Sequence, residues 1–269
     1  MAVLLVRGAG DVGSAVAHRL RSAGHAVVLH DDPSPAHPRR GMAFTDAFFD
    51  RGATLEGMLA KRSRDTAGLV PMLGCGRALP ASDDAFERVL EAVMPDAVVD
   101  ARMRKHAVPG DQRGFAPAVL GLGPGFAAGV NVHVVVETAW GDDLGRVIRK
   151  GPARDLAGEP RPLGGRGRER YVHSPVAGIL RTRFEIGQAV RAGEEVARVG
   201  ETAILAPLAG ILRGLTHDGA AVAAGAKIVE VDARGDPAAA FGIGERPAAI
   251  AAGVMAALVE PPARAGEPR

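Results

Sequence analysis

Residues 2–32 read AVLLVRGAGDVGSAVAHRLRSAGHAVVLHDD, and this stretch decides the expected fold. Residues 2–6 are apolar and predict a short buried strand. A glycine-rich turn follows at residues 8–13, and apolar residues then recur at helical spacing until Gly24, a typical helix end. A second apolar run at residues 26–30 predicts another strand. The order of strand, glycine turn, helix, strand and acid indicates a Rossmann-like α/β unit.

The glycine turn is the first candidate binding site. Gly8 permits a tight turn, Gly10 lets the backbone approach a diphosphate, and Gly13 lets helix and strand pack closely. The helix start, where Asp11 lies, offers free N–H groups and the positive end of the helix dipole. Asp31 follows Gly8 by about 20 residues, where an acid would hold a ribose hydroxyl. We expect a nucleotide-like ligand here, and the alternative is a tight turn that holds no ligand.

The rest of residues 1–150 is expected to complete one α/β domain that binds a nucleotide or cofactor. Apolar runs alternate with helical patterns, which favours a parallel sheet. Further strands are predicted at residues 97–99, 118–122 and 130–136, and helices at residues 45–50 and 83–93.

Charged residues near the expected carboxyl edge of this sheet are further candidates. Arg39 and Arg40 follow Asp31 in one loop and could clamp a phosphate, or they could be exposed surface charge. Asp100 and Lys105 follow the strand at residues 97–99, where ligands of such sheets bind. Lys105 would offer a point charge to a phosphate. Salt bridges among these side chains are the alternative.

A second glycine turn, GLGPGF at residues 121–126, ends another predicted strand. Its Gly123 and Gly125 could form a nest of backbone N–H groups that binds an anion, or the turn could be empty. Glu137 ends the following strand and is the best carboxylate for a polar role at this edge. A buried ion pair between Glu137 and Arg146 would also suit it.

Residues 151–170 are rich in proline, glycine and arginine and predict a linker. An internal repeat follows, because SPVAGILR at residues 174–181 returns as APLAGILR at residues 206–213. Two such halves can interlock into a small sandwich. The repeat resembles the biotinyl/lipoyl-like barrel-sandwich hybrid, which we assign to residues 171–234.

The hairpin between the two halves has no lysine, whereas carrier domains of this kind hold a modified lysine there. Lys227 lies near the end of the second half instead. We therefore expect a docking module without a swinging cofactor. Residues 235–269 are expected to form a C-terminal helix at residues 245–259 and then a tail.

The composition fits an ordinary globular protein, with 47% hydrophobic and 24% charged residues and a formal net charge of +2. One cysteine excludes a disulfide framework. The near-neutral charge and the scarcity of aromatic residues predict neither nucleic acid nor membrane as a partner. No signal peptide and no apolar span of about 20 residues is seen, so a cytoplasmic location is expected. The histidines lack metal-ligand spacing, and no metal site is expected.

Short sequence motifs along nearly the whole chain indicate a resemblance to a known family. The chain resembles the YqeB-type accessory family of selenium-dependent molybdenum hydroxylase systems, and its first turn is also similar to the XdhC/CoxI accessory proteins of xanthine dehydrogenase. The matching motifs include RGAGD at residues 7–11, AHRL at 17–20, PRR at 38–40, VDA at 99–101, LGR at 144–146 and GILRGL at 210–215.

This resemblance implies an accessory protein that helps a molybdenum hydroxylase to mature. It implies a nucleotide-containing cofactor such as a molybdopterin dinucleotide, a hydroxylase client as partner, and cofactor handling rather than turnover. Catalytic residues stay unknown, and a homo-oligomer is an open expectation.

Two alternatives remain at this point. An NAD(P)-dependent oxidoreductase agrees with the turn and Asp31. However, Tyr171 has Pro175 four residues further on, so the Tyr-x-x-x-Lys pair of short-chain dehydrogenases is missing. The other alternative is a non-catalytic binding module whose glycine turn is empty.

Overall fold

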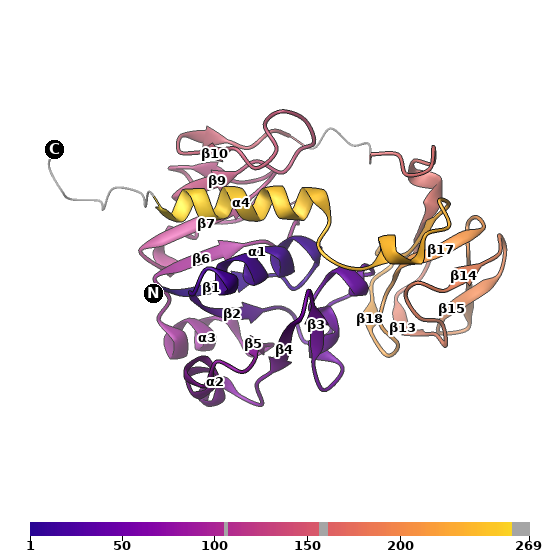
Figure 1. The fold of residues 1–269 in the computed structure, drawn as a ribbon, viewed down its shortest axis with the longest axis horizontal. Coiled ribbons are helices and arrows are strands. Elements are labelled where there is room, and N and C mark those ends of the chain that lie inside the picture. Colours follow the sequence, from indigo (N-terminus) through magenta and orange to yellow (C-terminus); the bar gives the residue numbers. More distant parts are fainter. Residues whose placement is uncertain (105–106, 156–160, 260–269) are drawn as a thin grey trace, which may run out of the picture.

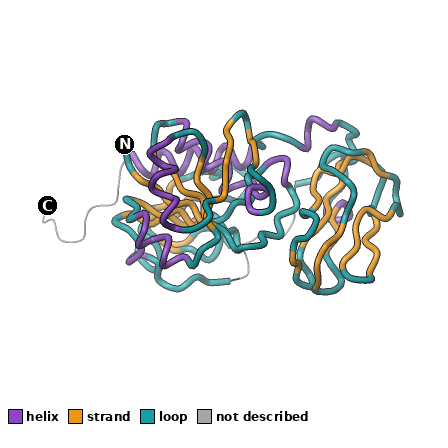
Figure 2. Tube along the Cα trace, turned by 90° about the horizontal axis from the view of Figure 1, so that it is seen from below, coloured by secondary structure: helices purple, strands orange, loops and turns teal. Residues whose placement is uncertain are grey.

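The computed structural model describes residues 1–104, 107–155 and 161–259. These residues form a large body of sheet and helices and a smaller all-β body beside it (Figures 1 and 2). The chain leaves the large body after residue 155, builds the small body, and then returns to lay its last helix on the large one (Figure 1). Every helix in the described ranges is too short or too polar to span a lipid bilayer.

The centre of the large body is a nine-stranded sheet. In spatial order its strands are β10 (Val147–Ile148), β9 (Val134–Val136), β7 (Ala118–Leu122), β6 (Ala97–Asp100), β1 (Val3–Arg7), β2 (Ala26–His30), β5 (Leu79–Ser82), β4 (Met58–Arg62) and β3 (Ala53–Leu55). Neighbouring strands from β9 to β4 run parallel. The two edge strands run antiparallel to their neighbours, so the sheet is mixed. A separate short ladder joins β8 (Ala127–Ala128) to β11 (Gly151–Pro152).

The described residues contain four α-helices: α1 (Asp11–Ser22), α2 (Leu69–Cys75), α3 (Phe86–Val93) and α4 (Glu245–Val259). α1 and α4 cover one face of the sheet, where Leu20 and Val254 are fully buried. α2 and α3 cover the other face through Leu69 and Val89. Figure 1 shows α4 alongside α1, across β9 and β10. The described parts of the connections after β6 and β7 hold no α-helix, so the C-terminal helix covers that end of the sheet.

The small body consists of two antiparallel four-stranded sheets. One contains β12 (Tyr171–His173), β19 (Lys227–Asp232), β17 (Gly210–Leu215) and β14 (Ala189–Val190), and the other contains β16 (Thr202–Leu205), β15 (Glu195–Val199), β13 (Gly178–Arg181) and β18 (Ala221–Val222). Strands of the first repeat pair with strands of the second, as β13 does with β18 and β14 with β17. Apolar side chains of both repeats therefore share one core, which includes Leu180 and Leu212.

The predicted fold class, an α/β Rossmann-like domain followed by a small all-β barrel-sandwich hybrid, is wrong for this structure. A Rossmann-like domain alternates strands and helices on both faces of a mostly parallel sheet. Here that alternation stops after β6, and both edges of the large sheet carry antiparallel strands. The physical reason is local, because the segments on either side of β7, residues 107–117 and 123–133, are rich in glycine and proline, which disfavour an α-helix there. The small body is built as two separate sheets.

Several local predictions are confirmed. The strands at residues 26–30 and 118–122 and the helix at residues 245–259 have the predicted bounds. The segment at residues 45–50 forms only a 3-10 turn (Thr45–Phe48), and the run at residues 130–136 is a strand only in its second half. The predicted tail after residue 259 lies outside the described residues.

The turn between β1 and α1 brings backbone into unusually close contact. Gly8 has a positive φ of 107°, and a Cβ added there would lie 2.8 Å from the backbone of Ala101. A Cβ at Gly13 would overlap the carbonyl oxygen of Gly8. Glycine is thus required for helix–strand packing at this turn, whether or not a ligand binds.

We expect Gly13→Ala to destabilise the protein by about 3 kcal/mol or more, because the new methyl group must displace backbone. Gly74→Ala is the matched control, since Gly74 lies in α2 and a Cβ there would meet open space. That change should leave stability equal or raise it by up to about 1 kcal/mol. Urea denaturation measures both variants. Equal midpoints for Gly13→Ala and the wild type would contradict the close-packing argument.

Candidate functional site

The backbone amides of the first glycine turn are already bonded within the protein. The N–H of Ala9 donates to Asp31 Oδ2 at 2.6 Å, and the N–H of Asp11 donates to His37 Nε2 at 3.1 Å. The N–H of Val12 donates to the carboxylate of Asp11 at 3.0 Å. Because side chains of the chain accept these bonds, the donors expected to cradle a diphosphate are in use.

His37 closes the space above this turn. A Cβ at Gly10 would lie 2.9 Å from His37 Nδ1, so the imidazole ring sits where the backbone was expected to approach a diphosphate. Burial lowers the pKa of His37 to about 4, so its ring is neutral at pH 7 and Nε2 can accept a hydrogen bond. In this structure the side chains of Asp31 and His37 therefore occupy the predicted diphosphate cradle at Gly8, Gly10 and Gly13.

Asp31 also has a different role from the predicted one. Its carboxylate accepts hydrogen bonds from the N–H groups of Ala9 and Asp32 at 2.6 and 2.8 Å. Burial raises the pKa of Asp31 above its ordinary value, and these two bonds only partly oppose that rise. The residue thus fixes the loop after β2 to the glycine turn, and a ribose hydroxyl would compete with these bonds.

Arg39 and Arg40 join the two bodies of the molecule. Arg39 Nε donates to Glu230 at 2.7 Å, and its Nη1 donates to Asp11 at 2.9 Å. Arg40 is buried and donates to the carbonyl oxygen of Leu215 at 2.7 Å and to Asp46 at 2.7 Å. In this structure both guanidinium groups make internal contacts, instead of lying free at the surface as a phosphate clamp.

Glu230, at the centre of these ion pairs, is fully buried on β19. Burial would raise the pKa of Glu230, but Arg39 and Lys227 outweigh it and lower the pKa to about 2. Arg39 and His37 likewise hold the pKa of Asp11 below its ordinary range, against the effect of burial. The contact between the two bodies thus depends on ionised carboxylates.

The second glycine turn and Glu137 are occupied by internal contacts as well. The N–H of Gly123 donates to Val136, and a Cβ at Gly125 would lie 2.7 Å from the carbonyl oxygen of Ala107. The carboxylate of Glu137 is buried and accepts from the backbone N–H groups of Thr138, Ala139 and Arg154 at 2.7 to 2.8 Å. The ion pair expected with Arg146 is replaced by one between Arg146 and Asp143.

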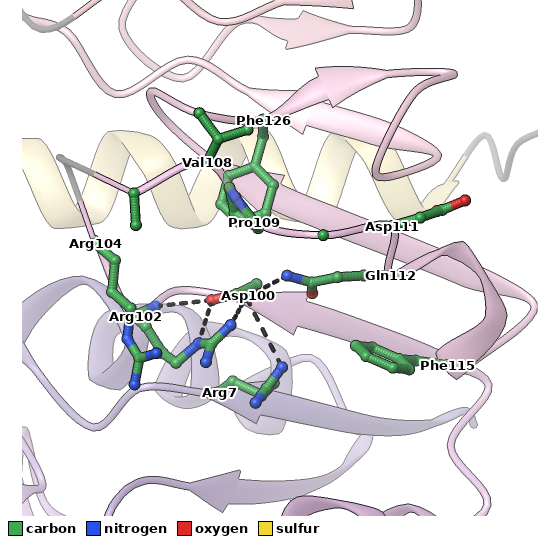
Figure 3. Close-up of a pocket in the computed structure, with 12 residues that line it drawn as sticks. Arg7, Asp100, Arg102, Arg104, Val108, Pro109, Asp111, Gln112, Phe115 and Phe126 are labelled. Carbon is green, nitrogen blue, oxygen red and sulfur yellow. Dashed lines mark hydrogen bonds and ion pairs between the residues drawn. The ribbon is translucent and has the colours of Figure 1, made fainter.

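A pocket of about 340 Å³ opens at the carboxyl ends of β1 and β6 (Figure 3). It lies on the face of the sheet covered by α3, since Arg7 contacts Phe86 of that helix. Its lining residues are Arg7, Asp100, Arg102, Arg104, Ala107, Val108, Pro109, Gly110, Asp111, Gln112, Phe115 and Phe126.

Asp100 is the buried anion of this pocket, as its place at the end of β6 predicts. It accepts from Arg102 Nε at 3.0 Å and from Gln112 Nε2 at 2.9 Å, and its Oδ2 lies 4.0 Å from Arg7 (Figure 3). Burial would raise the pKa of Asp100, but the hydrogen bonds from Arg102 outweigh it and lower the pKa. Lys105, predicted beside it, lies outside the described residues.

Arg7 is a buried cation whose charge is poorly compensated. Its side chain is 11% exposed, and its guanidinium carbon stands 3.5 Å from the centroid of the Phe86 ring. Burial and the charge of Arg102 lower the pKa of Arg7 to about 10, so it stays protonated at pH 7. Within the described residues its Nε has no hydrogen-bond partner. Asp100 is shared with Arg102, and a second anion near Arg7 would therefore be stabilising.

Gln112 offers one free acceptor to the pocket. Its Nε2 donates to Asp100, and because a carboxylate can only accept, this bond fixes the orientation of the amide. Its Oε1 is then buried with no partner in the part of the chain that the structure describes. Phe115 and Phe126 add an apolar wall (Figure 3). The pocket combines positive charge, one acceptor and an apolar surface.

The sequence reasoning missed Arg7 and Gln112. Arg7 had a usable signal, because a charged residue ends an apolar strand and points to the opposite face from Val6. Gln112 had no such signal, since a loop brings it to Asp100.

No group of three or more His, Cys, Asp or Glu side chains suited to a metal occurs within residues 1–104, 107–155 and 161–259.

Comparison with known proteins identifies one curated relative. No family model matches the chain. The chain is 37% identical over 257 residues to the uncharacterized protein YqeB of Escherichia coli K12, which covers 96% of this chain and 47% of that protein. The chain thus spans about half of the length of the relative it matches.

Solved structures give only distant matches. A product-bound ectoine utilization protein EutE (DoeB) from Ruegeria pomeroyi is 15% identical, with 86% of this chain and 85% of that chain covered and a TM-score of 0.25. A succinylglutamate desuccinylase/aspartoacylase from Rhodobacter sphaeroides is 15% identical, with coverage of 86% and 84% and a TM-score of 0.26. Likeness at this level carries no argument about the activity of this chain.

The family and function expected from the sequence are wrong on these findings. The matched relative has the name YqeB but is described as uncharacterized, so it supplies no link to molybdenum hydroxylases. The geometry points the same way, since His37 closes the turn that was expected to hold a dinucleotide. Neither maturation of a molybdenum hydroxylase nor NAD(P)-dependent oxidoreduction is retained.

The buried carboxylate of Glu230 predicts loss of stability in acid. Its folded pKa of about 2 lies below the ordinary value of 4.5, so its contribution is complete above pH 4.5 and disappears as the pH falls toward 2. Glu230→Gln should cost about 3–5 kcal/mol at pH 7, because the arginines around it lose their counter-charge. The variant should also lose less stability than the wild type between pH 4.5 and pH 2. Melting temperatures of both proteins across this range test the prediction, and parallel curves would contradict it.

Proposed function

We propose that this chain binds a small anionic ligand, one that carries a phosphate or carboxylate group, in the pocket at the carboxyl ends of β1 and β6. The observation that carries the proposal is the buried guanidinium of Arg7, whose Nε has no partner within the described residues and whose nearest carboxylate is shared. An anion placed there would gain a charge-assisted hydrogen bond and relieve the uncompensated charge.

Arg102 and Arg104 strengthen the positive end of the pocket. Arg102 is paired with the buried Asp100, whereas Arg104 makes a looser contact of 3.5 Å with the exposed Asp32. Three arginines thus line the pocket with two carboxylates, and one of these, Asp111, is already paired with Arg113. The remaining surplus of positive charge favours an anionic ligand over a neutral one.

The remaining lining describes the rest of the ligand. Phe115 and Phe126 offer an apolar wall to a hydrocarbon or aromatic part. The free Oε1 of Gln112 would accept a hydrogen bond from a hydroxyl or N–H group. A ligand with an anionic group, a donor and an apolar part uses all three features of the pocket.

Arg7→Met tests the proposal, because methionine keeps much of the packing against Phe86 and removes the charge. We expect it to weaken binding of phenyl phosphate at least about tenfold, since a hydrogen bond to a charged group contributes about 1.5–3 kcal/mol. The unliganded variant should be as stable as the wild type or more stable, because an uncompensated buried charge is removed. Isothermal titration calorimetry and urea denaturation measure the two effects.

Arg113→Gln is the matched control. Arg113 lies near the pocket, is half exposed and is held by Asp111, so its loss should change affinity by less than about twofold. Inorganic phosphate and benzoate, titrated in parallel, separate the contributions of phosphate, carboxylate and ring. Equal affinities for Arg7→Met and the wild type, or no saturable binding of any of the three probes to the wild type, would refute the proposal.

A further inference from the structure

A second concentration of charge lies where the two bodies meet. Four cationic side chains approach the fully buried carboxylate of Glu230. These are Arg39 at 2.7 Å, Arg170 and Lys227 at 3.4 Å each, and Arg213 at 3.7 Å. Arg39 comes from the loop after β2, Arg170 from the 3-10 turn before β12, Arg213 from β17 and Lys227 from the start of β19. One carboxylate therefore faces cations from both bodies.

The neighbouring carboxylates do not balance this charge. Asp11 pairs with Arg39, and Asp232 pairs with Arg213 and Arg234. The cluster thus holds four arginines and Lys227 around three carboxylates, and Arg246 adds a further positive charge near Asp11. Arginine keeps its proton under all ordinary conditions, whereas lysine can release one. Lys227 is the member of the cluster that can relieve the excess of positive charge.

The position of Lys227 leaves its amine within reach of a small molecule. Its side chain is 30% exposed, whereas Arg39, Arg170 and Arg213 are exposed by 21% or less. Its Nζ lies 4.4 Å from the centroid of the Tyr171 ring, which fixes the direction of the side chain. Burial and Arg39 lower the pKa of Lys227 to about 8, although Glu230 and Asp11 oppose this effect. A substantial fraction of the amine is unprotonated slightly above neutral pH.

We propose that Lys227 is a nucleophilic amine that forms an imine with an aldehyde or ketone carrying an anionic group. The lone pair of the neutral Nζ attacks the carbonyl carbon and forms a C–N bond, while the carbonyl π electrons move to oxygen. The carbinolamine then loses that oxygen as water, with the two hydrogens that the amine gives up. A C=N bond replaces the C=O bond, and no oxidant or reductant takes part.

The charges that remain after Lys227 loses its proton select an anionic reaction partner. Four arginines still face three carboxylates, and the Nε of Arg213 is buried with no hydrogen-bond partner in the described ranges. His37, which also faces this cluster, is neutral at pH 7 because burial lowers its pKa to about 4. A phosphate or carboxylate on the carbonyl compound would meet a positive potential here.

The composition of the chain makes the test direct, because it has only four lysines, at positions 61, 105, 150 and 227. The folded protein is treated with pyridoxal 5′-phosphate, an anionic aldehyde, and the imines are reduced with borohydride and quantified by peptide mass mapping. Lys61 and Lys150 are exposed internal references. At pH 7.5 we expect Lys227 to react at least about tenfold faster than either reference, because burial and Arg39 lower the pKa of Lys227 to about 8 and leave much of its amine unprotonated.

Two further readouts separate a reactive amine from a purely structural ion pair. The rate at Lys227 should level off above about pH 8, where most of its amine is unprotonated, so its pH profile should differ from those of the references. With pyridoxal, which lacks the phosphate, the ratio of the rate at Lys227 to the rate at Lys61 should fall to near one. Lys227→Arg keeps a cation beside Glu230 and should remove the fast-reacting site.

A rate at Lys227 equal to or below that of the references, or a pH profile parallel to theirs, would overturn the proposal. Equal preference for pyridoxal and its phosphate would overturn the anionic part of it. These rates come from the wild-type protein, so they decide the question even if Lys227→Arg fails to fold.

Discussion

The ion pairs of Arg39 with Asp11 and Glu230 are the interaction on which the arrangement of this molecule depends. Asp11 begins α1 in the large body, and Glu230 lies inside the small body. One guanidinium group therefore connects the glycine turn to the strand β19. The buried partners give this contact its strength, since removal of either carboxylate would leave Arg39 with only one counter-charge in a site shielded from water.

The same contact explains why the glycine turn does not act as its pattern suggests. The loop that carries Arg39 also carries His37, and docking of this loop on the small body places the imidazole over Gly10. A strand, a glycine turn and a helix give the geometry of a phosphate site, but binding needs free N–H groups as well. Here the side chains of Asp31, His37 and Asp11 accept those bonds.

Positive charge is not fully compensated at two places in the molecule. In the pocket, Arg7 shares the one carboxylate of Asp100 with Arg102, and at the junction several cations share Glu230. The first place has an apolar wall and a free acceptor, which suits reversible binding. The second has an amine able to lose its proton, which suits covalent chemistry. Two expectations about partners stay predictions. One is that neither nucleic acid nor a membrane is a partner, and the other is that the chain forms a homo-oligomer.

Local pattern alone determined the short elements of this protein. Apolar runs predicted β1, β2 and β7, helical spacing predicted α1, and an alanine-rich stretch predicted α4, because each of these signals lies within a short length of chain. The repeat predicted two interlocking halves. Asp100 could be placed at a strand end for the same reason. Only the tertiary structure decided that the described parts of the connections after β6 and β7 would hold no α-helix, that His37 would fill the turn, and that Arg7, Gln112 and Glu230 would matter. Such contacts join residues as far apart as Arg39 and Glu230, and no local periodicity encodes which buried charge will meet which.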